Sequence, residues 1–97
     1  MTLPESLMFV AQSPADLPKA DDILSRSGLE FMQAILEGEF AGAPIAETVG
    51  ITLTSVEDGR VIFSGTPQFE HCNPVGAVHG GWYGTLLDSA LGCAAMT

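Results

Sequence analysis

The feature that most constrains the fold is a segment that is apolar on every side when it is drawn as a helix. We expect this helix to open at Gly80, after a loop over 67–79. Its apolar side chains are spread almost all the way round the axis: Trp82, Tyr83, Leu86, Leu87, Ala90, Leu91, Ala94 and Ala95. A helix of this kind is buried, so it needs a sheet wrapped around it.

The middle of the chain predicts a β-hairpin. The segment Ile51–Glu57 is rich in the β-branched residues that favour strands. Asp58 and Gly59 form a strong two-residue turn signal, and we expect the second strand over Arg60–Thr66. Simple alternation would put Ile51, Leu53 and Ser55 on one face and Thr52, Thr54 and Val56 on the other.

A shorter helix is expected over about 28–37, where it has a packing role. Ser27 is suited to cap its start, with Glu30 three residues on as the partner in a capping box, and Gly38 fits its end. The apolar residues have helical spacing: Leu29, Met32, Ile35 and Leu36. The segment 41–50 is expected to turn the chain into the hairpin.

The first residues, 1–26, are expected to form an N-terminal extension, and 27–97 the domain. Pro4, Pro14 and Pro18 interrupt any helix there, so we expect a flexible segment. The alternative is a short helix around Leu7–Val10 that packs over the domain.

The order of helix, two strands and central helix predicts an α+β fold. Two strands cannot cover a helix that is apolar on all sides, and a hairpin alone is marginally stable. We therefore expect the sequence to hold only the N-terminal part of a longer domain. Hydrophobic residues make up 46% of the 97 residues, which also predicts surface buried against a partner.

The charge balance excludes some classes of partner. Lys and Arg number three against twelve Asp and Glu, a formal net charge of -9. Binding of nucleic acid needs clustered Lys and Arg, so we expect neither nucleic acid nor an anionic membrane as a partner. Two cysteines and the lack of a secretory signal at the start favour a reduced, cytoplasmic protein.

Two glycines at the predicted start of the apolar helix are candidates for binding an anion. The first N–H groups of a helix have no partner inside it, and the helix dipole is positive there. Gly80 and Gly81 would let a substrate approach this backbone without meeting a side chain. The pair then either stabilises a developing oxyanion or forms a tight loop-to-helix junction.

Asp88 is the candidate acid. A carboxylate on a buried helix is costly unless it is bonded, so Asp88 either has a local donor or acts in a cleft as general base or nucleophile. It lies eight residues from Gly80, or roughly 12 Å along a helix, which is too far for both to act on one carbonyl carbon. A twofold dimer would bring Gly80 of one chain near Asp88 of the other, giving two equivalent sites.

The neighbouring polar residues have alternative roles. His79 either contacts a substrate carbonyl or has a structural role, and Asn73 either holds a water or forms the turn before Pro74. The set His71, Cys72, His79 and Cys93 matches no standard zinc spacing, so no metal is expected. Cys72 lacks a suitably placed base for a nucleophilic role, because the adjacent His71 rarely faces it productively.

The stretch "NPVGAVHGGWYGTLLDSALGCAAM", 73–96, resembles the signature of the hotdog-fold acyl-CoA thioesterases of the phenylacetic-acid-degradation (PaaI-like) branch. The resemblance extends over about 45–97. It implies a hotdog fold, an antiparallel sheet wrapped around one long central helix, of which this sequence contains the first two strands and that helix. It also implies an acyl-CoA substrate, no cofactor, and a homodimer or a dimer of dimers.

The resemblance further assigns roles to residues. The Gly80 N–H would polarise the thioester carbonyl with help from Gly81, and Asp88 of the partner subunit would activate water or attack directly. Asn73 would hold the water or the carbonyl, and His79 would orient the loop or contact the thioester. Substrate-binding roles are expected for Gly81, for His71 and for Trp82, which with Tyr83 either lines an acyl pocket or belongs to the core.

Three other interpretations stay open. A non-catalytic hotdog module would bind acyl-CoA without hydrolysis, although a buried Asp88 argues against it. An acyl-thioester dehydratase would pair a His with an acid differently. In the third interpretation, the chain is an inactive fragment of the enzyme. The sequence does not name the acyl group, separate dimer from tetramer, or decide whether Asp88 is base or nucleophile.

Overall fold

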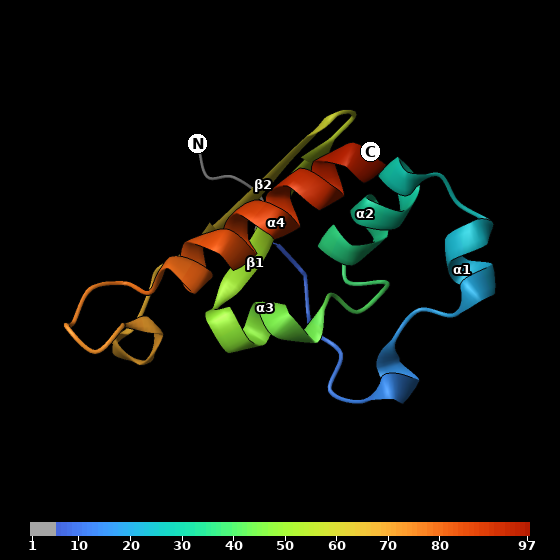
Figure 1. Cartoon of the computed structure of the whole chain (residues 1–97). Coiled ribbons are helices and arrows are strands. Elements are labelled where there is room, and N and C mark those ends of the chain that lie inside the picture. The colour runs from blue at the N-terminus through green and yellow to red at the C-terminus, as the bar shows by residue number, and fades with distance from the viewer. Residues whose placement is uncertain (1–5) are drawn as a thin grey trace.

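The chain has an α+β fold, with a two-stranded antiparallel sheet and one long helix (Figure 1). The structure is a computed structural model that describes residues 6–97. β1 (Ile51–Glu57) and β2 (Arg60–Gly65) form the hairpin, and α4 (Gly80–Met96) runs beside β2. The predicted hairpin is confirmed, with Gly59 at a φ of 73° in the turn.

α2 (Gly28–Leu36) packs on β1 and meets α4. The predicted capping box is confirmed: the Glu30 N–H donates to Ser27 Oγ at 3.1 Å, and the Ser27 N–H donates to the Glu30 carboxylate at 3.0 Å. These bonds from Ser27 lower the pKa of Glu30. A Cβ on Gly28 would overlap the carbonyl oxygen of Met96, so glycine lets the start of α2 touch the end of α4.

The predicted faces of β1 are wrong beyond Leu53. A β-bulge leaves Thr54 without a partner in the register, so that Leu53 pairs with Phe63 and Val56 pairs with Val61. Opposed residues share a face, and an extra residue reverses the alternation that follows it. Val56 therefore lies on the face of Leu53, and Ser55 lies on the other face opposite Ile62.

The segment expected only to turn the chain contains a helix, α3 (Pro44–Val49). Proline suits the first position of a helix because its missing N–H is not needed there. Gly50 ends the helix with a φ of 68°, as expected for a glycine after the last turn. The segment 41–50 was expected only to turn the chain, so this six-residue helix was missed.

The described part of the N-terminal segment is attached to the domain. Leu7–Val10 contains no helix, so the alternative of a helix there is wrong. Backbone bonds join Leu7 to Leu36 and join both Phe9 and Ala11 to Gly42. Beyond them lie the short helices η1 (Pro14–Asp16) and α1 (Ala20–Leu24). Met1–Glu5, including Pro4, lie outside the described residues.

The expectation that α4 is buried on all sides is wrong. Leu53 and Trp82 are 0% and 6% exposed in the core, whereas Leu87 and Leu91 on α4 are 59% and 71% exposed. Covered and exposed residues recur along α4 with the helical period, so the helix has an inner face packed on the domain and an exposed outer face. The inner face is Trp82, Leu86, Ser89, Cys93 and Met96; the outer face is Gly84, Leu87, Asp88, Leu91 and Ala95. No helix within residues 6–97 has the length and hydropathy needed to cross a lipid bilayer.

Candidate functional site

The start of α4 presents one open backbone N–H group. A Cβ on Gly80 would meet no atom within 4 Å, and the Gly80 N–H has no hydrogen-bond partner among residues 6–97. The Gly81 N–H, in contrast, donates to Nδ1 of His79 at 2.8 Å. The expected help of Gly81 in binding an oxyanion is therefore blocked in this conformation, and Gly80 alone is free.

His79 is the N-terminal cap of α4. Its Nδ1 accepts the bond from Gly81, which assigns the ring proton of the neutral imidazole to Nε2. The His79 backbone N–H donates to the carbonyl of His71 at 2.8 Å, and its carbonyl accepts from Trp82 at 3.0 Å. The ring itself is exposed, so His79 orients the junction while its Nε2 stays open to a ligand.

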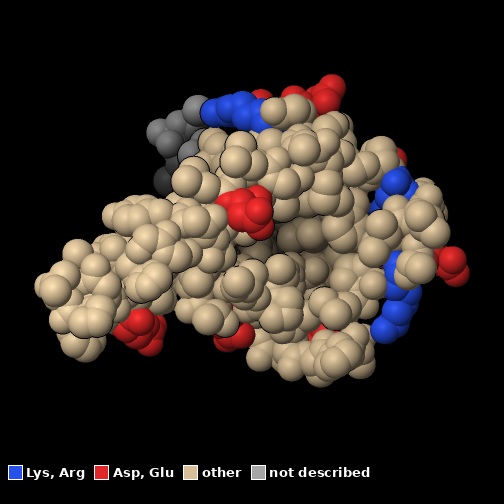
Figure 2. Space-filling model, in the orientation of Figure 1, with Lys and Arg blue, Asp and Glu red and all other residues tan. Residues whose placement is uncertain are grey.

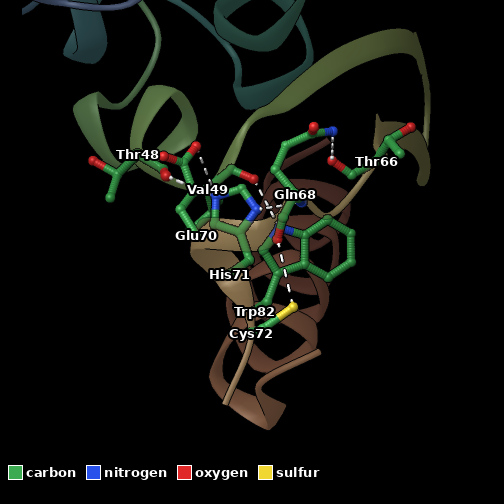
Figure 3. A network of polar contacts seen from close by, with 8 residues as sticks. All are labelled: Thr48, Val49, Thr66, Gln68, Glu70, His71, Cys72 and Trp82. Atoms are coloured by element: carbon green, nitrogen blue, oxygen red, sulfur yellow. Dashed lines mark hydrogen bonds and ion pairs between the residues drawn. The ribbon is translucent and has the colours of Figure 1, made fainter. Parts of the chain in front are cut away.

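His71 is held on both ring nitrogens and is only 9% exposed as a side chain (Figure 3). Its Nδ1 accepts from the Gln68 N–H at 2.9 Å, which leaves Nε2 to donate to the Thr48 carbonyl at 3.2 Å. With both nitrogens occupied, His71 ties η2 (Phe69–His71) to the end of α3. Its substrate-binding role stays a prediction.

Trp82 lies beside His71, with ring centroids 6.3 Å apart (Figure 3). Its indole N–H donates to the Val49 carbonyl at 2.7 Å, and its ring packs on Ala46 and Ile51. The sequence analysis expected Trp82 either to line an acyl pocket or to belong to the core, and the structure places it in the core. Tyr83 meets Trp82 edge-on and is half exposed.

Asn73 forms the turn at the tip of the loop. Its side-chain oxygen accepts from the N–H groups of Val75 and Ala77, both at 3.1 Å, and its backbone N–H donates to the Ala77 carbonyl at 2.7 Å. The side-chain oxygen is therefore occupied, and the amide nitrogen is the group of Asn73 that remains for a water or a carbonyl.

Asp88 is exposed on the outer face of α4, so the expectation of a buried carboxylate is wrong. The Asp88 side chain makes no hydrogen bond or ion pair within residues 6–97. In Figure 2 the surface over α4 is uncharged apart from one acidic group, and Asp88 is the only charged residue of this helix. Burial and, secondarily, the charge of Asp88 raise the pKa of the Cys93 thiol.

A hollow of about 200 Å³ lies beside the start of α4. It brings together four of the predicted residues, His71, His79, Gly81 and Trp82, with Cys72. Sequence reasoning missed Val49 and Glu70, which also line it, because α3 and η2 reach the hollow only through tertiary packing. Asp88 is absent from its walls and lies roughly 12 Å along the unbroken helix from Gly80.

The described residues bring no three potential metal ligands together among their His, Cys, Asp and Glu side chains. Cys72 and Cys93 are both free thiols. No protein-family model, curated protein or solved structure matches the chain.

Proposed function

We propose that this protein hydrolyses an acyl-CoA thioester in an assembly of two copies. The observation that carries the proposal is the pairing of an open Gly80 N–H with an unpartnered, exposed Asp88 on the same helix, α4. The resemblance of 73–96 to the PaaI-like thioesterases supports the reaction and the substrate, and with them a hotdog fold.

The assembly follows from the geometry of α4. Gly80 and Asp88 cannot meet within one chain, since a straight helix keeps them roughly 12 Å apart. A second copy placed on the outer face by a twofold axis covers Leu87 and Leu91 and brings its Asp88 toward Gly80. Burial of two exposed leucines per copy supplies the driving force for association.

The chemistry needs only these groups and water. Asp88 of the partner subunit accepts a proton as water attacks the thioester carbonyl carbon, and the Gly80 N–H stabilises the negative charge that forms on the carbonyl oxygen. The tetrahedral species then collapses with cleavage of the C–S bond. The proton held by Asp88 passes to the sulfur, so the products are the free acid and CoA thiol. His79 orients the junction that presents Gly80.

The test is release of CoA from a panel of aryl and medium-chain acyl-CoAs by purified protein. Asp88→Asn keeps the shape of the side chain and removes the base, so we expect the rate to fall by about 100-fold or more. Asp58→Asn, in the exposed hairpin turn, is the matched control and should keep full activity. An Asp88→Asn protein as active as the wild type would refute the assigned role.

The exposure of Asp88 also favours a second candidate, a non-catalytic module that binds acyl-CoA. A buried acid would argue against such a module, but an exposed acid is ordinary on a protein surface. Binding of acyl-CoA without release of CoA by the wild-type protein would select this candidate.

A further inference from the structure

A second and larger pocket lies among the helices and the hairpin. Figure 2 shows it as a hollow in mostly uncharged surface, with acidic atoms at its edge, between α4, α2 and α3 of Figure 1. Its volume is about 270 Å³. The inner face of α4 contributes Ser89, Cys93 and Met96 to it, so it adjoins the half of the helix that is far from Gly80.

The walls of this pocket are almost entirely apolar. α2 contributes Phe31, Met32 and Ile35, and the hairpin contributes Leu53 and Phe63. No Lys, Arg, His, Asp or Glu of the described chain lines it. The polar side chains in the walls are the Ser89 hydroxyl and the Cys93 thiol, and burial raises the pKa of that thiol, which keeps it uncharged.

Backbone contacts set the positions of the elements that form the walls. The close contact between Gly28 and Met96 fixes one end of α2 against α4. Backbone bonds between Phe9 and Gly42 hold the segment that enters α3. Apolar walls offer water no hydrogen-bond partners, and enclosed apolar cavities of about 150 Å³ in proteins accept benzene. A pocket of about 270 Å³ has room for a larger ring system.

We propose that this pocket binds a small uncharged apolar molecule, such as a fused aromatic ring or a branched aliphatic compound. A ligand with a carboxylate or phosphate inside the pocket would find no cation in the described walls, and burying an unpaired charge is costly. The net charge of -9 adds repulsion of anions. The proposal does not depend on the thioesterase reaction, because it uses neither Gly80 nor Asp88.

The test compares two fluorescent probes that share their rings and differ in charge. N-phenylnaphthylamine is neutral, and anilinonaphthalene sulfonate carries the same rings with an anionic group. We expect the neutral probe to bind with one site per chain and the sulfonate to bind at least about tenfold more weakly. Equal affinity for both probes, or no saturable binding of the neutral one, would overturn the proposal.

Two substitutions on α4 locate the site. Cys93→Phe puts a phenyl group into the pocket and should weaken the neutral probe by about tenfold or more. Ser89→Leu fills the pocket from a neighbouring turn and is the second variant if Cys93→Phe fails to fold. Leu91→Gln, on the outer face, is the control and should leave the affinity unchanged. Loss of binding in Leu91→Gln with retention in both pocket variants would place the probe on the outer face and refute the pocket.

Discussion

The inner and outer faces of α4 are built from similar residues but meet different surroundings. Trp82 on the inner face is 6% exposed and is bonded to Val49, whereas Leu91 on the outer face is 71% exposed. The helix sequence is apolar on both sides, so its composition does not separate them. The difference arises from the elements packed against one face, α2, α3 and the hairpin, and from the lack of any covering of the other by residues 6–97.

The comparison explains the position of the acid. Asp88 lies on the uncovered face, where water solvates its carboxylate at little cost. If a second copy covers this face, Asp88 becomes partly buried and gains the low-dielectric surroundings in which a general base is effective. Asp88 is thus an exposed surface acid in the single chain and the general base in the assembly that we propose.

The largest expected effect is the contrast in stability between the two faces. Trp82→Ala removes a core ring and its hydrogen bond, so the free energy of unfolding should fall by about 3–5 kcal/mol. Leu91→Ala should change the free energy of unfolding of the single chain by about 0.5 kcal/mol or less. Urea unfolding at low protein concentration measures both. Equal losses would mean that the outer face is covered even in the single chain.

Association of two copies should depend on the outer face. Leu91→Glu places a charge where each copy would bury a leucine worth about 1.5–3 kcal/mol, so the Kd of the dimer should rise by about 100-fold or more. Sedimentation over a range of concentrations measures it. Glu57→Gln, an exposed change on the hairpin, is the control. A wild-type protein that stays monomeric while it releases CoA would contradict the shared site.

The junction at the start of α4 should depend on the hydrogen bonds of His71, whose side chain is 9% exposed. His71→Ala removes the hydrogen bonds to the Gln68 N–H and the Thr48 carbonyl, each worth about 0.5–1.5 kcal/mol. His79→Ala removes an exposed helix cap, which is worth about 0.5–2 kcal/mol. Thermal unfolding of both variants compares them. A larger loss in His79→Ala would show that capping, and not the His71 network, fixes the junction.

Local sequence signals predicted the parts of the fold that local chemistry determines. The Ser27 and Glu30 capping box, the Asp58-Gly59 turn and the start of α4 at Gly80 all depend on neighbours within a few residues. The bulge at Thr54 has no such signal, because it is set by the pairing of two strands.

The sequence named candidate site residues but did not predict what surrounds them. The partners of His71 come from α3 and from the loop before η2, so its fixed orientation follows from tertiary packing. The exposure of Asp88 likewise depends on which elements cover α4, because apolar side chains lie on both sides of the helix and do not mark the covered face.

The smallest expected effect tests whether the two faces of α4 interact electrostatically. Burial and the charge of Asp88 raise the pKa of Cys93, so its alkylation rate should keep rising to a higher pH than that of a free thiol, since the thiolate is the reactive form. Asp88→Asn removes one of the two causes, lowers the pKa of Cys93 and should modestly speed its alkylation at a fixed mildly alkaline pH. Mass spectrometry follows Cys93, with Cys72 as the internal reference. An unchanged ratio of the two rates would mean that the outer acid is screened from the inner thiol, and that the faces of α4 act independently.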